Sequence, residues 1–202
     1  MQHLHRERTE HLPAYILAGG RSSRFGSDKA RALLQGRPLI VHVAEMLAPV
    51  ATRTTVVAGT GTTYDDLGLT SIHDRRPGLG PMGGIEAALS DLCSHEDWLL
   101  LASCDLVQVR PHWIERLRAH REPGARAVAF RPDQWQPLLA LYHRSIQESV
   151  NQRLNDGRTA MWQLLDAVRA VAAPVPADWP DVVQVNTPRD LERFLAGKPR
   201  KD

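Results

Sequence analysis

Features typical of membrane, secreted and nucleic-acid-binding proteins are missing from this sequence. No apolar run approaches the roughly 20 residues that a helix needs to cross a bilayer. Residues 1–12 are polar and charged, with no apolar segment like that of a secretory signal. Lys and Arg number 25 against 23 Asp and Glu, so the formal charge is only +2 and indicates no basic excess for nucleic acid. We therefore expect neither a membrane nor a nucleic acid as a partner.

Cysteine is also scarce. The chain contains only Cys93 and Cys104, which form no CxxC pair or other spacing typical of metal ligands. Such a pattern indicates reduced structural thiols, and we expect a cytoplasmic protein. With 43% hydrophobic and 24% charged residues, the 202-residue chain has the composition of one globular domain with a single substantial core.

The chain instead contains an alternation of short apolar runs and amphipathic segments. Apolar residues at 40, 43, 44 and 47 follow the spacing of a helix buried on one face, and the continuous run 98–102 is typical of a buried strand. Thr187, with Pro188 after it and Asp190 three residues later, predicts the start of the last helix. We predict strands at 15–17, 54–57, 70–73, 98–102, 127–130, 138–142 and 182–185, and helices at 40–47, 85–92, 112–120, 161–168 and from 188 onward.

This alternation predicts an α/β fold: a single Rossmann-like three-layer domain with a mostly parallel central sheet covered on both faces. We place the domain at 13–196, between a polar N-terminal arm (1–12) that contains three histidines and a polar C-terminal tail (197–202). Ligands bind such sheets beyond the carboxyl ends of the strands. The functional loops are therefore expected after Leu17, Val57, Ile72 and Ser103.

The loop after the first strand, LAGGRSSRFGSDK at 17–29, is the strongest indication of a ligand. Gly19 and Gly20 allow the backbone N–H groups to approach phosphate oxygens, while Arg24 and Lys29 add positive charge. The loop matches neither the Walker A motif nor the GxGxxG dinucleotide motif. A glycine-rich turn without a ligand is the structural alternative.

Two acidic residues are candidates for the same edge. Asp105 follows the buried strand, where one carboxylate together with substrate phosphates would suit Mg²⁺. Asp74 precedes a glycine-rich segment, 78–84, that could close over a ligand and begin a helix. A solvated loop Asp and a structural turn are the respective alternatives.

Together, these motifs resemble those of the molybdenum cofactor guanylyltransferases. The family pattern is a Leu-Ala-Gly-Gly loop followed by Arg, an apolar residue, Gly and Asp-Lys, and segment 17–29 matches it, with Phe25 where Met is more usual. Further matches occur in order and near the expected spacing, over roughly residues 13–195: Asp74 with GPMGGI at 80–85, Cys104-Asp105, QPLLALY at 136–142 and VNTPRDL at 185–191.

The resemblance implies a fold of the nucleotide-diphospho-sugar transferase type and a Mg²⁺-dependent transfer of GMP from GTP to the terminal phosphate of molybdopterin. It implies GTP and molybdopterin as partners, together with molybdoenzyme-assembly proteins. The site residues that we carry over fall into three groups: catalytic Lys29, Arg24 and the metal ligand Asp105; nucleotide-binding Leu17, Ala18, Gly19, Gly20, Lys29, Asp74 and Asp105; and acceptor-binding Gly80, Pro81, Gln136, Arg158 and Asn186.

The sequence departs from the family pattern at two further places, and two other functions stay open. Val107 stands where the family usually has Pro, and Gly59 and Thr60 stand where relatives often have an Asn. One alternative is a cytidylyltransferase acting on the same cofactor, although such enzymes tend to have Ala at the position of Gly19. The other alternative is a non-catalytic protein that binds or delivers the molybdenum cofactor.

Overall fold

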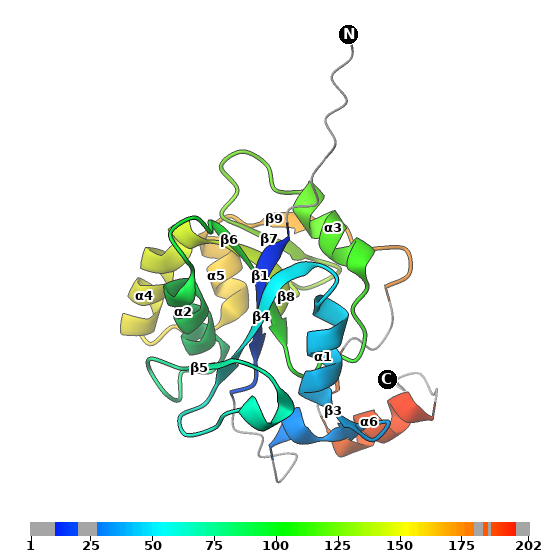
Figure 1. Cartoon of the computed structure of the whole chain (residues 1–202). Helices are drawn as coiled ribbons and strands as arrows, with labels where there is room; N and C mark the ends of the chain where they lie inside the picture. The colour runs from blue at the N-terminus through cyan, green and yellow to red at the C-terminus, as the bar shows by residue number, and fades with distance from the viewer. Residues whose placement is uncertain (1–10, 20–27, 180–183, 186, 197–202) are drawn as a thin grey trace.

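The computed structural model describes residues 11–19, 28–179, 184–185 and 187–196. Figure 1 shows a central sheet with helices on both of its sides. The sheet has seven strands, in the spatial order β5 (Ser71–His73), β4 (Ala51–Ala58), β1 (Leu12–Leu17), β6 (Trp98–Ser103), β8 (Leu139–His143), β7 (Ala127–Phe130) and β9 (Val171–Ala173).

The sheet is mostly parallel, as the sequence predicts. Strands β5, β4, β1 and β6 run in one direction, and β7 pairs in parallel with β9. Strand β8 is antiparallel to both of its neighbours, β6 and β7. The carboxyl ends of β5, β4, β1, β6, β7 and β9 therefore lie at one edge of the sheet, and the start of β8 lies there too.

Each strand contributes side chains to two cores because its residues point alternately to opposite faces. On β1, Ile16 belongs to a core shared with α1 (Leu39–Leu47) and α3 (Pro111–Ala119). Its neighbours Tyr15 and Leu17 face a second core under three helices: α2 (Pro81–Asp91), α4 (Gln147–Asn155) and α5 (Met161–Ala167). The expected three layers are confirmed, and Figure 1 shows the two helix groups on opposite sides of the strands.

The last helix, α6 (Pro188–Leu195), lies near a short hairpin of β2 (Leu33–Leu34) and β3 (Arg37–Pro38). Both turn residues of the hairpin, Gln35 and Gly36, have positive φ angles of 52° and 81°, as a type I′ turn requires. The Thr187 hydroxyl accepts a hydrogen bond from the Asp190 N–H at 3.1 Å, which confirms the predicted helix cap.

The observed elements differ from the predicted ones in several places. The sequence patterns indicated neither the β2–β3 hairpin nor α4 and β9. Of the predicted strand 182–185, residues 182–183 lie outside the described residues, and Gln184 forms an isolated antiparallel bridge with Leu106 instead of a regular strand. The other predicted elements are present with shifted ends; α2 begins four residues earlier than expected. None of the helices in the described part of the chain is long and apolar enough to span a membrane.

Candidate active site

Four loops leave the carboxyl edge of the sheet side by side. Leu17 at the end of β1 is in register with both Val57 of β4 and Ser103 of β6, and Val57 is in register with Ile72 of β5. The pairing extends beyond the strands, because the Ala18 N–H donates to the Val57 carbonyl at 2.9 Å. The expectation that these four strand ends share one edge is confirmed.

A lysine and an aspartate that are distant in sequence form an ion pair at this edge. The Lys29 Nζ lies 2.6 Å from Asp105 Oδ2, and the two side chains are only 14% and 13% exposed. The other carboxylate oxygen of Asp105 accepts a hydrogen bond from the hydroxyl of Ser103, the last residue of β6. Gln184 donates in turn to the Ser103 hydroxyl at 3.3 Å. The Asp105 carboxylate is therefore held from two sides, in a region where limited water strengthens electrostatic interactions.

Lys29 is positioned by the residue before it. Asp28 caps the short 3₁₀ helix η1 (Lys29–Arg31), accepting a hydrogen bond from the Ala30 N–H at 3.0 Å. Its second oxygen accepts a hydrogen bond from the hydroxyl of the buried Tyr64 at 3.0 Å. Asp28 therefore ties the start of η1 to the segment after β4 and fixes the direction in which Lys29 leaves the backbone.

The first loop, the turn after β4 and the loop after β5 meet at Gly19. A Cβ atom at Gly19 would lie 3.3 Å from the Gly59 nitrogen and 3.4 Å from Asp74 Oδ2, so any side chain there would crowd both neighbours. Gly59 itself begins a turn closed by the Thr62 N–H, which donates to the Gly59 carbonyl at 3.1 Å. Of the residues predicted to bind the nucleotide, the structure thus places Gly19 and Asp74 close together.

The pKa of Asp74 is raised above its ordinary value. Burial is the main cause, and the charge of Glu86 adds to it, while His73 partly offsets both. Glu86 comes from α2 and is 4% exposed. A carboxylate kept in such surroundings is costly in free energy, and strongly perturbed pKa values are common at functional sites.

The loop between β5 and α2 is tied to the helix layer. Arg76 Nε lies 3.0 Å from one oxygen of Glu86, and Arg76 also donates to Asn155 of α4 at 2.7 Å. Gly80 has a φ of 61° directly before Pro81, the first residue of α2, so a residue with a side chain would be strained there. Gly80 and Pro81 therefore lie where this loop enters the helix.

Some of the remaining predicted residues lie in loops at the carboxyl edge of the sheet, and the others lie outside the described part of the chain. Gln136 lies between β7 and β8, two residues before Leu138, whose carbonyl accepts a hydrogen bond from the Ser103 N–H at 3.1 Å. Arg158 is exposed in the loop before α5. Gly20, Arg24 and Asn186 lie outside the described residues.

Two contributors to the site were missed by the sequence reasoning. Ser103 could have been recognised as the last residue of a strand that ends at the predicted edge. Tyr64 gave no usable signal, because its contact with Asp28 spans 36 residues of chain.

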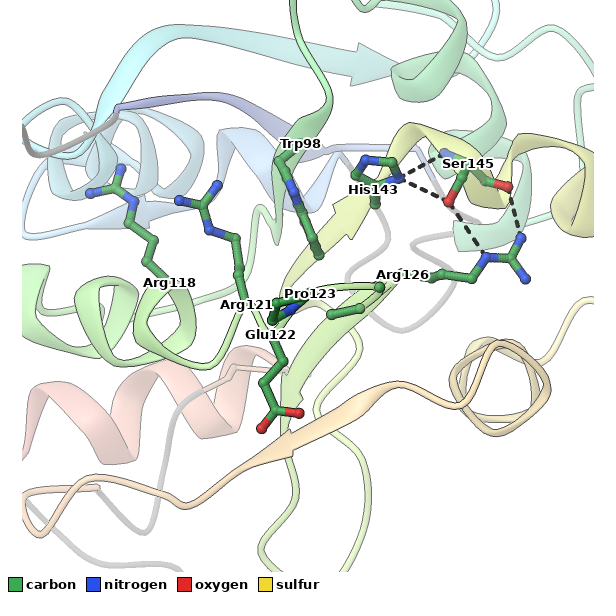
Figure 2. Close-up of a pocket in the computed structure, with 10 residues that line it drawn as sticks. Trp98, Arg118, Arg121, Glu122, Pro123, Arg126, His143 and Ser145 are labelled. Carbon is green, nitrogen blue, oxygen red and sulfur yellow. Dashed lines mark hydrogen bonds between the residues drawn. The ribbon is translucent and has the colours of Figure 1, made fainter.

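A basic cavity of about 500 Å³ lies at the other edge of the sheet (Figure 2). Its lining includes Trp98, the first residue of β6, and His143, the last residue of β8. Arg121 lies over the Trp98 ring, 5.7 Å from its centroid. The amino ends of parallel strands are not where such sheets bind their ligands, and none of the predicted site residues lines this cavity.

Comparison with known proteins agrees with this geometry. Residues 14–175 match the family model described as the MobA-like NTP transferase domain. The chain belongs to this family. It is therefore a nucleotidyltransferase, as the resemblance of its motifs implied.

Relatives and a solved structure support the same assignment. The chain is 42% identical, over 72% of its length and 75% of the relative's, to a probable molybdenum cofactor guanylyltransferase from Deinococcus radiodurans. It is 32% identical to a molybdenum cofactor guanylyltransferase from Vibrio parahaemolyticus, over 89% of this chain and 92% of that protein. The crystal structure of molybdopterin-guanine dinucleotide biosynthesis protein A from Archaeoglobus fulgidus superposes with a TM-score of 0.78 at 26% identity, covering 92% of this chain and 99% of that one. The expected fold of the nucleotide-diphospho-sugar transferase type is confirmed.

Proposed function

We propose that this nucleotidyltransferase transfers the GMP part of GTP to the terminal phosphate of molybdopterin and releases pyrophosphate. The observation that carries the proposal is the Lys29–Asp105 pair, 2.6 Å apart and largely shielded from water at the ligand-binding edge of the sheet. The pair supplies a cation for phosphate oxygens and a carboxylate for a metal ion at one point. The names of the relatives supply the guanylyl donor and the molybdenum cofactor as acceptor.

The oxygen donors at this point fit Mg²⁺. Asp105 offers a carboxylate and Ser103 a hydroxyl beside it, and Mg²⁺ is commonly bound by one or two carboxylates together with water and substrate phosphates. Among the described residues, no three His, Cys, Asp or Glu side chains gather into a dedicated metal cage. Asp105 would therefore hold the ion jointly with the nucleotide. When bound, Mg²⁺ neutralises phosphate charge in the transition state.

The residues of the chain position the reactants. Lys29, Arg24 and the N–H groups of Gly19 and Gly20 would hold the triphosphate, and Asp74 would contact the nucleotide. An oxygen of the acceptor phosphate bonds to the α-phosphorus while the bond from that phosphorus to the bridging oxygen breaks, and pyrophosphate leaves with the electron pair. The phosphate monoester is mostly dianionic at neutral pH, so the reaction needs no general base.

The acceptor side would use amide groups and a cation, because molybdopterin is polar and anionic. Gln136, Arg158 and Asn186 are our candidates, with Gly80 and Pro81 at the entrance to α2. Substituting Gln136, Arg158 and Asn186 singly by Ala should leave GTP binding unchanged and reduce guanylyl transfer. Transfer at the wild-type rate in all three variants would place the acceptor elsewhere.

GTP with Mg²⁺ should raise the melting temperature of the protein clearly more than CTP or ATP does, since only the correct nucleotide binds the folded chain tightly. Gly19 supports the guanylyl reading over the cytidylyl one, because it leaves more room for a purine base than the Ala typical of cytidylyl enzymes. Equal or greater protection by CTP would favour the cytidylyltransferase instead. Protection by GTP without any turnover of molybdopterin would favour a binding or delivery protein.

A further inference from the structure

A second cavity, of about 520 Å³, lies at the carboxyl edge of the sheet between the β7–β8 loop and α5. The topology fixes its position. Strand β7 ends at Phe130 and β8 begins at Leu139, which pairs with Ala102 near the end of β6. Pro137 lines the cavity and adjoins Leu138, the residue that binds the Ser103 N–H. The cavity therefore lies close to the end of β6, where the chain enters the loop that carries Asp105. In the strand order, it is on the opposite side of β6 from the strands that precede Gly19 and Asp74.

Two tryptophans give this cavity aromatic walls. Trp135 is buried, and its ring N–H donates to Asp166 of α5 at 2.7 Å, which fixes its orientation. Trp162, in the first turn of α5, is 55% exposed, an unusual position for the largest side chain. Met161 lies beside it in the lining and is 6% exposed. A pocket of this size with a fixed and an open aromatic face suits a flat fused-ring molecule.

Polar groups of both signs stand at the rim. The Arg131 guanidinium lies over the Trp135 ring, 4.8 Å from its centroid, and no carboxylate in the described part of the chain forms an ion pair with it. Asp133 also lines the cavity and can accept hydrogen bonds from ring N–H and amino groups. A ligand with a donor edge and an anionic substituent would satisfy both residues.

We infer that this Trp135–Trp162 cavity binds the pterin rings of the acceptor, with Trp162 stacked on the ring face, Asp133 at the amino edge and Arg131 near the anionic groups. The inference rests on the proposed function, because the pterin class of the acceptor comes from it. It assigns to Trp162, Arg131 and Asp133 a part in acceptor binding that the family motifs do not include.

The experiment measures binding of a stable probe, 6-hydroxymethylpterin monophosphate, to the full chain by the change in pterin fluorescence. Removing one aromatic stacking partner commonly costs about tenfold or more in affinity, so Trp162→Ala should raise the Kd by at least about tenfold. Trp162→Phe, which keeps a ring, should stay within about threefold of wild type. Arg131→Ala should weaken binding, whereas Arg116→Ala, an exposed arginine of α3, should not.

Protection against thermal unfolding by GTP and Mg²⁺, measured on the same variants, separates this inference from the guanylyl assignment. We expect that protection to be unchanged in Trp162→Ala. Wild-type affinity for the pterin in Trp162→Ala, or no binding of the pterin to the wild-type chain, would overturn the inference even where GMP transfer proceeds. A selective loss of pterin binding in Trp162→Ala would support it even if the nucleotide donor proved not to be GTP.

Discussion

At the scale of single residues, sequence motifs identified Lys29 and Asp105 separately but did not predict the contact between them. Each residue belongs to a motif, so both could be selected from the sequence. Their contact joins positions 76 residues apart, and only the shared edge of β1 and β6 brings them together. The support that Asp28 receives from Tyr64 could not be predicted, because that hydrogen bond joins positions 36 residues apart.

Asp105→Asn should abolish guanylyl transfer while leaving the protein folded. The substitution removes the carboxylate charge at almost constant volume, and loss of one such stabilising group commonly lowers kcat by about 10²–10³-fold or more. Asp97→Asn, which changes an exposed carboxylate 3.9 Å from Arg144, serves as the matched control. Turnover of Asp105→Asn within a few-fold of wild type would rule out Asp105 as the metal ligand.

Lys29→Ala should chiefly raise KM for GTP, since the Lys29 charge meets phosphate in both the ground state and the transition state.

Asp74→Asn should stabilise the folded protein at neutral pH while weakening nucleotide binding. The pKa of Asp74 is raised in the folded chain by burial and by Glu86. Ionisation is therefore costlier in the folded state than in the unfolded one, and the wild type loses stability as the pH rises from the ordinary Asp pKa to the raised one. The variant should melt at a higher temperature than the wild type at pH 7, and the gap should close as the pH falls well below about 4, where Asp74 is protonated in both states. A melting-temperature difference independent of pH would contradict this origin.

At the scale of elements, the patterns that were predicted correctly have strong periodicity. Helix α1 and strand β6 bury regularly spaced or continuous apolar residues. Helix α4 was missed because its nine residues are mostly polar and only Val150 and Leu154 are buried. Strand β9 has three residues, too few for any alternation to be recognised. The antiparallel direction of β8 could not be predicted either, since side-chain alternation is the same in both directions.

Arg76→Ala should loosen the packing of the β5–α2 loop against α2 and α4. It would leave the Glu86 carboxylate, 4% exposed, without the cation 3.0 Å away; its other oxygen already has no hydrogen-bond partner within the described chain. Unpairing a buried acceptor costs roughly 1–3 kcal/mol, which urea unfolding would detect. Adding Glu86→Gln should recover part of the loss. Arg75→Ala should be nearly neutral, because this neighbour donates only to Ser90 among the described residues, and an equal loss there would argue against the Glu86 explanation.

At the scale of the whole molecule, the two edges of the sheet carry different chemistry. The carboxyl edge holds the Lys29–Asp105 pair, the neighbouring Gly19 and Asp74, and the Trp135–Trp162 cavity. The amino edge holds the basic cavity of Figure 2, which the rule for parallel sheets separates from the reaction. The topology expected from the sequence placed the functional loops at the carboxyl edge, and the Lys29–Asp105 pair lies there. The Trp135–Trp162 cavity itself was not predicted, because Trp135 and Trp162 belong to none of the family motifs.

The two cysteines offer a test of whether this edge is closed to reagents in the folded protein. Cys93 is exposed, whereas Cys104 is 8% exposed, and burial together with the charge of Asp105 raises the pKa of its thiol to about 12. The thiolate is the reactive form, so a disulfide reagent at pH 8 should modify one thiol per folded chain and the second only in denaturant. Cys93→Ser should remove the fast reaction entirely. Two fast equivalents in the native wild type, or a fast reaction remaining in Cys93→Ser, would mean that the β6 end beside Asp105 opens far more readily than its packing indicates.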